Sequence, residues 1–407
     1  MNEFKKLGII EPLLKVIEEE HFKEPTEIQA KSIPVVIEGK DVLAGSATGS
    51  GKTLAFASGI LQSIEKRKGI QAIILTPTRE LAEQVGNSFK KFAKYVPVKT
   101  VIVYGGVSIG PQIEKIKSAD IVVGTPGRVL DHLSRNTLRL DKVKTLVLDE
   151  ADRMLDMGFR DDVEKIMKQC PKFKQTLLFS ATITRELSEL SKKYMKNPVK
   201  VSAESYVDAK KLKQIYYDVQ DNMKFSMLVH LLKHEQAGLA MVFCNTRKNV
   251  DFVADNLKSS GVDALAIHGG FTQDKRSKIM KQFDSQKRLY VLVCTDVAAR
   301  GLDIQGVSHV YNYDIPKDPK EYIHRIGRTA RAGSEGKAIN ILVNRDYNNF
   351  RKVMRENDVD VEKEKTPFVE RVKIKPAKPS NDFRKKKSGG FGGGKSKYGG
   401  GKRNYHR

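Results

Sequence analysis

Two successive series of short apolar runs, each alternating with segments of helix length, constrain the fold more than any other feature of this sequence. In the first series the runs are nearly unbroken stretches of Val, Ile and Leu, at residues 42–44, 72–76, 101–104, 121–124, 145–149 and 176–180. Such runs are typical of parallel strands that are covered on both faces. Segments long enough for helices, such as 53–67 and 79–93, separate them. This alternation predicts a doubly wound α/β sheet.

The second series follows a polar stretch near residues 203–211 and repeats the pattern. Its predicted strands are residues 214–219, 240–244, 264–268, 290–294, 309–313 and 338–343. We therefore predict two tandem domains with doubly wound parallel sheets, at residues 1–203 and 213–365, joined by a linker at 204–212. Ligands of such sheets bind at the carboxyl ends of the strands, so both domains can face one ligand.

The composition fits a soluble globular protein, with 40% apolar and 30% charged residues among 407. No apolar run approaches the roughly 18–20 residues of a membrane-spanning helix, and the first ten residues lack the apolar core of a signal peptide. Cys170, Cys244 and Cys294 are far apart and form no C-x-x-C pair, which favours buried thiols over a metal site or a disulfide. We expect a cytoplasmic protein without a membrane partner.

Positive charge is concentrated at the C-terminal end of the chain. Lys and Arg exceed Asp and Glu by 73 − 49 = 24, and residues 371–407 contain 13 basic residues and one acidic residue. Residues 366–407 lose the periodic pattern and become rich in Lys, Arg, Gly and Ser, so we predict a disordered, basic, glycine-rich tail. Its charge favours a polyanion partner, and Phe391, Tyr398 and Tyr405 could stack on exposed bases. A tail that only aids solubility is the alternative.

The most informative single motif is SATGSGKT at residues 46–53, which follows an apolar run and precedes a helix-length segment. Glycines in such a loop let backbone N–H groups curl around phosphate oxygens, and the following helix contributes its positive N-terminus. We predict that a nucleotide's phosphates bind at Ser46, Ala47, Thr48, Gly49, Ser50 and Gly51. Lys52 would reach the β- and γ-phosphates, and the Thr53 hydroxyl would bind Mg²⁺. The general pattern has Gly where Ser46 stands.

A second motif is the apolar run 145–149, which ends in the adjacent carboxylates Asp149 and Glu150. Two carboxylates at the end of a buried strand are costly unless a cation or a reaction uses them. We predict that Asp149 binds Mg²⁺ together with Thr53, and that Glu150 orients and deprotonates the attacking water. Together with Lys52, these residues indicate an ATPase.

The second series supplies three arginines, Arg325, Arg328 and Arg331, spaced at i, i+3 and i+6 in YIHRIGRTAR. On a helical segment this spacing keeps them on neighbouring surface, where three like charges repel unless an anion is present. A triphosphate would provide that anion. If these arginines act on a nucleotide held by Lys52, hydrolysis requires the two domains to close.

These motifs, in this order, resemble those of the DEAD-box ATP-dependent RNA helicases of superfamily 2, over about residues 4–345. The resemblance implies two RecA-like domains, ATP and Mg²⁺ as cofactors, and RNA as partner. Residues 22–29 are similar to the family's Q motif, which implies that Gln29 reads the adenine edge and that Phe22 stacks on its face. It also implies that Asp303 contacts the ATP ribose, while Arg328 and Arg331 are fingers for the γ-phosphate.

The resemblance further implies an RNA site and a coupling network. The expected RNA-contacting residues of both domains are Pro77, Thr78, Arg79, Gly105, Gly106, Thr125, Arg128, Thr246, Gln273, Arg276 and Thr295. The residues expected to link the ATP state to the RNA site are Asp152, Ser180, Thr182, His324 and Arg325.

Three positions depart from the family pattern. Ser46 stands where Ala is usual, Ala330 where Gly is usual, and His21 where Gly is frequent before the stacking aromatic. Ala330 lies between two predicted fingers, so the change could alter backbone freedom there. His21 bears on the edge of the adenine pocket.

We therefore predict an RNA helicase that couples ATP hydrolysis to local duplex unwinding and to remodelling of RNA or ribonucleoprotein. An ATP-gated RNA clamp with little productive unwinding is the alternative. A DNA translocase on the same two-domain plan fits the sequence 77–81 and the sequence 149–152 less well.

Overall fold

The computed structural model describes residues 3–45, 50–202, 212–235, 237–285, 289–299, 304, 306–330 and 335–375. Six residues of the predicted site lie outside these ranges: Ser46, Ala47, Thr48, Gly49, Asp303 and Arg331. Most of the predicted linker, and the tail beyond residue 375, also lie outside them.

The first half of the chain forms a seven-stranded sheet in the order β3-β4-β2-β5-β6-β1-β7. Its strands are β1 (Val42–Gly45), β2 (Ala72–Leu75), β3 (Thr100–Val103), β4 (Ile121–Gly124), β5 (Thr145–Asp149), β6 (Gln175–Ser180) and β7 (Val199–Ser202). Every pairing is parallel, and the four central runs are buried along their whole length or nearly so, as their unbroken apolar sequences predict.

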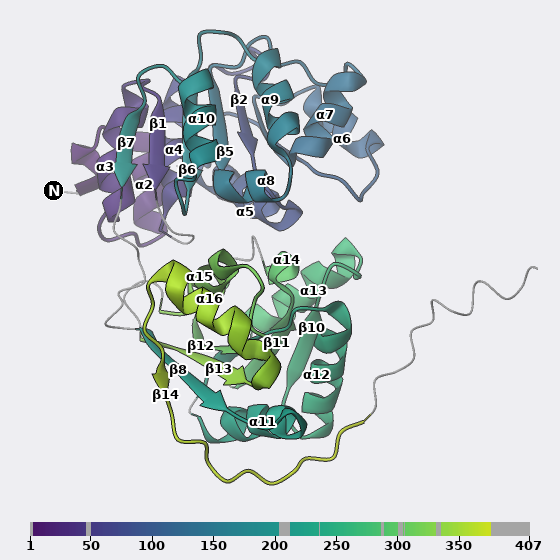
Figure 1. Ribbon diagram of the computed structural model, residues 1–407. Helices are drawn as coiled ribbons and strands as arrows, with labels where there is room; N and C mark the ends of the chain where they lie inside the picture. The colour runs from purple at the N-terminus through teal and green to yellow at the C-terminus, as the bar shows by residue number, and fades with distance from the viewer. Residues whose placement is uncertain are drawn as a thin grey trace, which may run out of the picture. The chain divides into compact units, whose positions relative to one another are not determined.

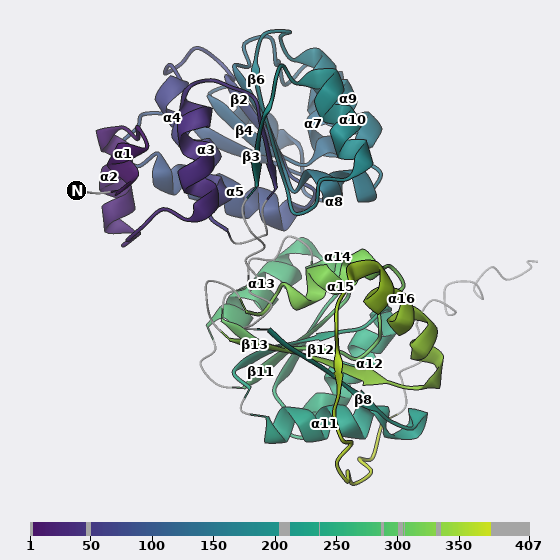
Figure 2. The same cartoon turned by 60° about the vertical axis from the view of Figure 1, so that its left-hand side comes forward.

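Helices cover both faces of this first sheet (Figures 1 and 2). One face packs against helices whose apolar residues share a core with Val42, Ile74 and Phe179; they are α1 (Glu3–Lys6), α2 (Glu11–Glu19), α3 (Glu27–Ile37), α4 (Lys52–Ser63) and α5 (Arg79–Phe92). The opposite face packs against α7 (Pro126–Ser134), α8 (Ala151–Asp156), α9 (Arg160–Gln169) and α10 (Arg185–Tyr194). The short α6 (Gly110–Ile116) follows β3 at the edge of the sheet.

The second half repeats this design, with a parallel sheet in the order β10-β11-β9-β12-β13-β8-β14. Its strands are β8 (Leu212–Asp218), β9 (Leu239–Phe243), β10 (Ala264–Ile267), β11 (Tyr290–Cys294), β12 (Val307–Asn312), β13 (Gly336–Leu342) and β14 (Glu362–Lys363). Counted from its first strand, each sheet places its strands in the same order, so the two halves share one topology.

Helices again cover both faces of the sheet. One face carries α11 (Lys224–His234) and α12 (Arg247–Ser259), and the other carries α13 (Gln273–Asp284), α14 (Asp296–Ala299), α15 (Pro319–Ile326) and α16 (Tyr347–Asn357). Two short 3₁₀ turns, Asp221–Met223 and Asn344–Asp346, precede α11 and α16. Cys244 and Cys294 belong to the cores on opposite faces and are fully buried, which confirms the prediction of buried thiols.

The predicted fold class is confirmed, and all twelve predicted strands are present. The prediction missed two edge strands, β7 and β14, because short edge strands carry polar residues and lack an unbroken apolar run. The first predicted helix was too long: α4 ends at Ser63, and Arg67 and Gly69 adopt left-handed backbone conformations. No described helix is long and apolar enough to cross a membrane.

The chain stays attached to the second half beyond β14. Thr366 Oγ1 donates a hydrogen bond to the Asp218 carbonyl, and the Val372 amide donates to Ser226 Oγ at 3.0 Å. Val369 and Val372 pack against the core beneath α11. The compact part of the chain, which contains both halves, accordingly extends to Val372.

Candidate functional site

The end of the predicted phosphate-binding loop is held by the segment that resembles the Q motif. Thr26 Oγ1 donates to the Ser50 carbonyl at 2.7 Å, and Gln29 Nε2 donates to the Gly51 carbonyl at 2.9 Å. Gly51 has φ +87°, and a Cβ atom there would lie 2.4 Å from Gln29 Nε2. Glycine is therefore required at position 51, both by backbone conformation and by space. Phe22 is 39% exposed, so its face is available; adenine recognition by Phe22 and Gln29 stays a prediction.

Lys52 and Asp149 form a buried pair of opposite charges at the ends of α4 and β5. Lys52 Nζ lies 3.3 Å from Asp149 Oδ1, an ion pair without normal hydrogen-bond geometry. Among the described residues neither Lys52 Nζ nor either Asp149 oxygen has a hydrogen-bond partner. Burial raises the pKa of Asp149, and the charge of Lys52 offsets this only in part. Buried charges without hydrogen bonds are costly, so this pair fits a site completed by phosphate oxygens and a divalent cation.

Glu150 is held differently, although it is the next residue. Arg153, one helical turn further along α8, donates from Nη1 to Glu150 Oε2 at 2.7 Å, and both side chains are buried. Burial alone would raise the pKa of Glu150, but the charges of Arg153 and Lys52 outweigh it and hold that pKa below its usual value. Glu150 also has a left-handed backbone, with φ 54° and ψ 51°, a conformation that costs a non-glycine residue about 1–2 kcal/mol. Arg153 was not among the predicted site residues, although opposite charges at positions i and i+3 indicate such a pair.

Three of the residues predicted to couple the ATP and RNA sites form one hydrogen-bond network. The Asp152 amide donates to Ser180 Oγ at 3.2 Å, and Ser180 Oγ donates to the Thr182 carbonyl at 2.8 Å. Asp152 Oδ2 accepts from both the amide and the hydroxyl of Thr182, at 2.8 and 2.9 Å. The ends of β5 and β6 are thereby fixed to each other.

Arg325 is completely buried in the second half, where all five of its N–H donors are engaged. It pairs in bidentate fashion with Asp296, from Nε to Oδ1 at 2.5 Å and from Nη2 to Oδ2 at 2.7 Å. Its other bonds reach the Asp314 carbonyl, Asn312 Oδ1 and Asn245 Oδ1. The guanidinium therefore ties together the ends of β9, β11 and β12. The role of Arg325 between the domains, predicted from the resemblance, stays a prediction.

Two other predicted site residues of this motif lie within the described ranges, His324 and Arg328. His324 lies on α15, 4.0 Å from Glu321, and Arg328 follows the helix with its side chain buried. Ala330, two residues after Arg328, has a left-handed backbone with φ 54°, at a position where the family usually has glycine.

In the first half, the predicted RNA-contacting residues lie on three loops that leave neighbouring strands, or in the first turn of the helix that follows the loop. Thr78 follows β2 and caps α5 by accepting a hydrogen bond from the Leu81 amide. Gly105 and Gly106 follow β3, while Thr125 and Arg128 follow β4. Because β3, β4 and β2 are adjacent and parallel, these loops share one edge of the sheet. Arg79 packs on Gly106, since a Cβ atom on that glycine would lie 2.1 Å from Arg79 Nη1.

The second half places the corresponding residues at the equivalent edge. Thr246 follows β9 and caps α12, accepting from the Asn249 amide at 3.1 Å. Thr295 follows β11, Gln273 begins α13, and Arg276 donates to the Ala298 carbonyl at 3.3 Å.

The shared topology also points to two residues that were not predicted to contact RNA, Arg247 and Gly269. Arg247 follows Thr246 as Arg79 follows Thr78, and Gly269 follows β10 as Gly105 follows β3. Arg247 Nη2 lies 3.4 Å from where a Cβ atom on Gly269 would stand. An arginine beside a glycine pair therefore recurs in both halves, a signal visible only once the strands are aligned.

The fold and this site define a nucleotide hydrolase built from two α/β halves. The first half matches the family model of the DEAD/DEAH box helicases over residues 26–190, and the second matches that of the helicase conserved C-terminal domain over residues 223–333. The DEAD-box ATP-dependent RNA helicase CshA of Bacillus cereus is 44% identical over 359 residues, which cover 87% of this chain and 68% of that protein. The ATP-dependent RNA helicase CshA of Listeria monocytogenes is 46% identical over 355 residues, 86% of this chain and 68% of that protein.

Solved structures agree. Dbp5 of S. cerevisiae bound to RNA and ADP BeF3 superposes with a TM-score of 0.80 at 33% identity, covering 89% of this chain and 95% of that chain. A DEAD box protein from the hyperthermophile Methanococcus jannaschii gives a TM-score of 0.57 at 42% identity, over 89% of this chain and 99% of that chain. The chain belongs to the DEAD-box ATP-dependent RNA helicase family. It is an enzyme that uses ATP and binds RNA.

Proposed function

We propose that this enzyme separates short RNA duplexes by closing two domains, residues 1–203 and 213–365, around ATP, Mg²⁺ and one RNA strand. The observation that carries the proposal is the buried Lys52–Asp149 pair, whose charged atoms have no hydrogen bonds among the described residues. Such a pair is costly in the free protein and becomes favourable when phosphate and cation complete it. Ligand binding thus gains free energy that is available for domain closure.

In this proposal the nucleotide lies along the loop 46–53. Lys52 binds the β- and γ-phosphates, Thr53 and Asp149 hold Mg²⁺, and Phe22 and Gln29 recognise adenine. The bound Mg²⁺ would neutralise charge on the phosphate oxygens. Glu150 accepts a proton from the attacking water through Oε1, because Arg153 engages Oε2.

The second domain completes the reaction. Arg328 and Arg331 stabilise the charge on the transferred phosphoryl group, and Asp303 contacts the ribose. Because these residues belong to the domain opposite Lys52, hydrolysis depends on closure. Asp152, Ser180 and Thr182 would transmit the nucleotide state from β5 and β6 toward the RNA site.

RNA lies across the strand-end loops of both domains. The first domain would contribute Pro77, Thr78, Arg79, Gly105, Gly106, Thr125 and Arg128, and the second Thr246, Gln273, Arg276 and Thr295. To these we add Arg247 and Gly269, on the strength of their equivalence to Arg79 and Gly105. The basic residues 366–407 would add affinity for RNA that does not depend on sequence.

The test is a measurement of coupling between the two ligands. If the closed form binds both ligands, a nonhydrolysable ATP analogue with Mg²⁺ must raise the affinity for single-stranded RNA by some factor. RNA must then raise the affinity for the analogue by the same factor. ATP should also separate a short RNA duplex. Reciprocal tightening without strand separation would favour an ATP-gated clamp. Independent binding of the two ligands would overturn the proposed closure mechanism.

A further inference from the structure

The glycine pair predicted to contact RNA sits on a loop that has no regular secondary structure to hold it. The loop, Tyr104 to Ile109, joins β3 to α6, and β3 is the edge strand of the sheet, so the loop has a neighbouring strand on one side only. Gly106 has φ +80°, and Gly106, Val107 and Ser108 are exposed. The backbone groups of such a loop need partners supplied from elsewhere.

Gln112 supplies them. It lies on α6 and is 93% buried, with 7% of its surface exposed. Its Oε1 accepts a hydrogen bond from the Tyr104 amide at 3.2 Å, and its Nε2 donates to the Tyr104 carbonyl at 3.2 Å and to the Ser108 carbonyl at 3.3 Å. One amide side chain therefore binds the loop on both sides of Gly105 and Gly106.

A second buried layer supports this amide. His132 on α7 is completely buried, with Nε2 3.5 Å from Gln112 Oε1 and Nδ1 2.9 Å from Thr137 Oγ1. Burial lowers the pKa of His132, and the nearby Arg128 charge lowers it further. A neutral imidazole thus backs the amide without bringing a charge into the core.

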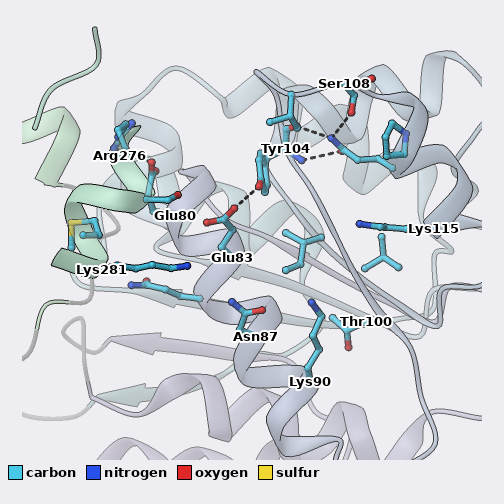
Figure 3. A pocket seen from close by; sticks show the side chains of 18 of the residues that line it. Glu80, Glu83, Asn87, Lys90, Thr100, Tyr104, Ser108, Lys115, Arg276 and Lys281 are labelled. Atoms are coloured by element: carbon cyan, nitrogen blue, oxygen red, sulfur yellow. Dashed lines mark hydrogen bonds and ion pairs between the residues drawn. The ribbon is translucent and has the colours of Figure 1, made fainter. Parts of the chain in front are cut away.

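The same helix also reaches the loop directly. Arg128 Nη2 donates to the Val107 carbonyl at 3.0 Å, and Arg128 Nη1 is buried without a hydrogen-bond partner among the described residues. At the start of the loop the Tyr104 hydroxyl donates to the carboxylate of Glu83 on α5, as Figure 3 shows. The glycine pair is therefore fixed relative to Arg79 and Arg128, its neighbours in the proposed RNA site.

We propose that Gln112 is a positioning residue for RNA: its amide holds the loop Tyr104 to Ile109 in the conformation that presents Gly105 and Gly106, beside Arg128, to the RNA backbone. The inference rests on the proposed RNA contacts of this loop. Without the amide, the Tyr104 and Ser108 backbone groups lose partners, and RNA must order the loop as it binds. A cost of this kind weakens binding and leaves ATP chemistry unchanged.

The same sheet contains a matched control. Gln71 is 1% exposed, and its side-chain amide also makes a pair of hydrogen bonds to the backbone of one residue. It accepts from the Glu65 amide at 3.1 Å and donates to the Glu65 carbonyl at 2.6 Å. It precedes β2, so it clamps a loop at the amino edge of the sheet, away from the proposed RNA site. Gln71→Leu should therefore perturb folding as Gln112→Leu does, but not RNA binding.

The experiment measures ATPase rate against RNA concentration for the full chain and its variants. Gln112→Leu should raise the RNA concentration for half-maximal stimulation about tenfold, with the KM for ATP and the rate at saturating RNA within about twofold of wild type. Gln71→Leu should leave all three values unchanged. If Gln112→Leu folds poorly, Gln112→Asn takes its place in the test. This variant keeps a polar amide but shortens its reach, and it should give the same RNA defect.

Arg128→Ala separates the two levels of the proposal. If Arg128→Ala weakens RNA and both Gln112 variants do not, the positioning role is overturned while the RNA surface stands. If Gln71→Leu weakens RNA as much as Gln112→Leu, the effect is one of stability and the positioning role is again overturned. If Arg128→Ala has no effect on RNA either, the surface itself is wrong and the inference falls with it.

Discussion

The two halves of the molecule have the same strand order but treat their buried charges in opposite ways. In the first half, Lys52 at the start of α4 and Asp149 at the end of β5 are buried with no hydrogen bonds among the described residues. In the second half, Arg325 is equally buried and has a partner for every N–H. One topology therefore carries a site that is incomplete without a ligand and another that is complete without one. The contrast predicts different consequences for mutations of buried charges in the two halves.

The largest expected effect is on turnover in the first half. Glu150→Gln should lower kcat by about 10²–10⁴-fold, because the amide cannot accept the proton of the attacking water. ATP and RNA should still bind, and the amide oxygen can still accept the Arg153 hydrogen bond. Single-turnover hydrolysis alongside equilibrium binding of both ligands tests this, and a variant that turns over normally would remove Glu150 as the base.

The next largest effect is on stability in the second half. Arg325→Met should lower the free energy of unfolding by about 3–5 kcal/mol, since it leaves the partly buried Asp296 without its bidentate partner and removes the other hydrogen bonds of the guanidinium. Arg345→Met is the control, because the Arg345–Asp221 pair at 2.7 Å is exposed on both sides and should be worth little. Denaturant unfolding of both variants decides the matter; equal stabilities would mean that the Arg325 network contributes nothing net.

The comparison can be repeated at Asp149, where the loss of stability should be smaller. Asp149→Asn should abolish hydrolysis but destabilise the ligand-free protein by only about 1–2 kcal/mol, less than Arg325→Met. Lys52 loses the partner of its buried charge, but no hydrogen bond of Asp149 among the described residues is lost. Asp152→Asn should destabilise, since Asp152 Oδ2 accepts two hydrogen bonds from Thr182. Thermal unfolding without nucleotide measures both. An Asp149→Asn variant that loses as much stability as Arg325→Met would show that the Lys52 pair is as favourable in the free protein as the Arg325 network.

The smallest effects concern the two left-handed residues that replace family glycines, one in each half. His21 has φ 57° and an exposed side chain, so His21→Gly should stabilise the protein by about 0.5–1 kcal/mol. Ala330 has φ 54° but is buried, so Ala330→Gly loses apolar packing as it relieves strain and should be nearly neutral. Equal shifts in melting temperature for the two variants would contradict this account.

Much of this architecture could be predicted from the sequence because its signals are local. Unbroken apolar runs such as β2 and β5 mark parallel strands, and the sequence around Lys52 and Asp149 marks the phosphate site. Arg153, Gln112 and His132 escaped prediction, since each acts through a partner whose position depends on the folded chain. Arg247 and Gly269 became visible only when β9 and β10 were matched to β2 and β3. The roles predicted for Asp303, Arg331 and the tail beyond residue 375 fall on residues outside the described ranges.

The bond between Gln29 and the phosphate-binding loop has a consequence for which purine fits. The side-chain amide of Gln29 donates one N–H to the Gly51 carbonyl, and its oxygen accepts a hydrogen bond from the backbone amide of Thr26 with one lone pair. One N–H and one lone pair are left, side by side. Adenine offers an acceptor at N7 beside a donor at N6, which matches this remaining pair, whereas guanine offers two acceptors at the same edge. If Gln29 contacts the base, as the resemblance to the Q motif predicts, the hydrogen-bonding groups that it does not use to hold the loop would complement adenine and not guanine.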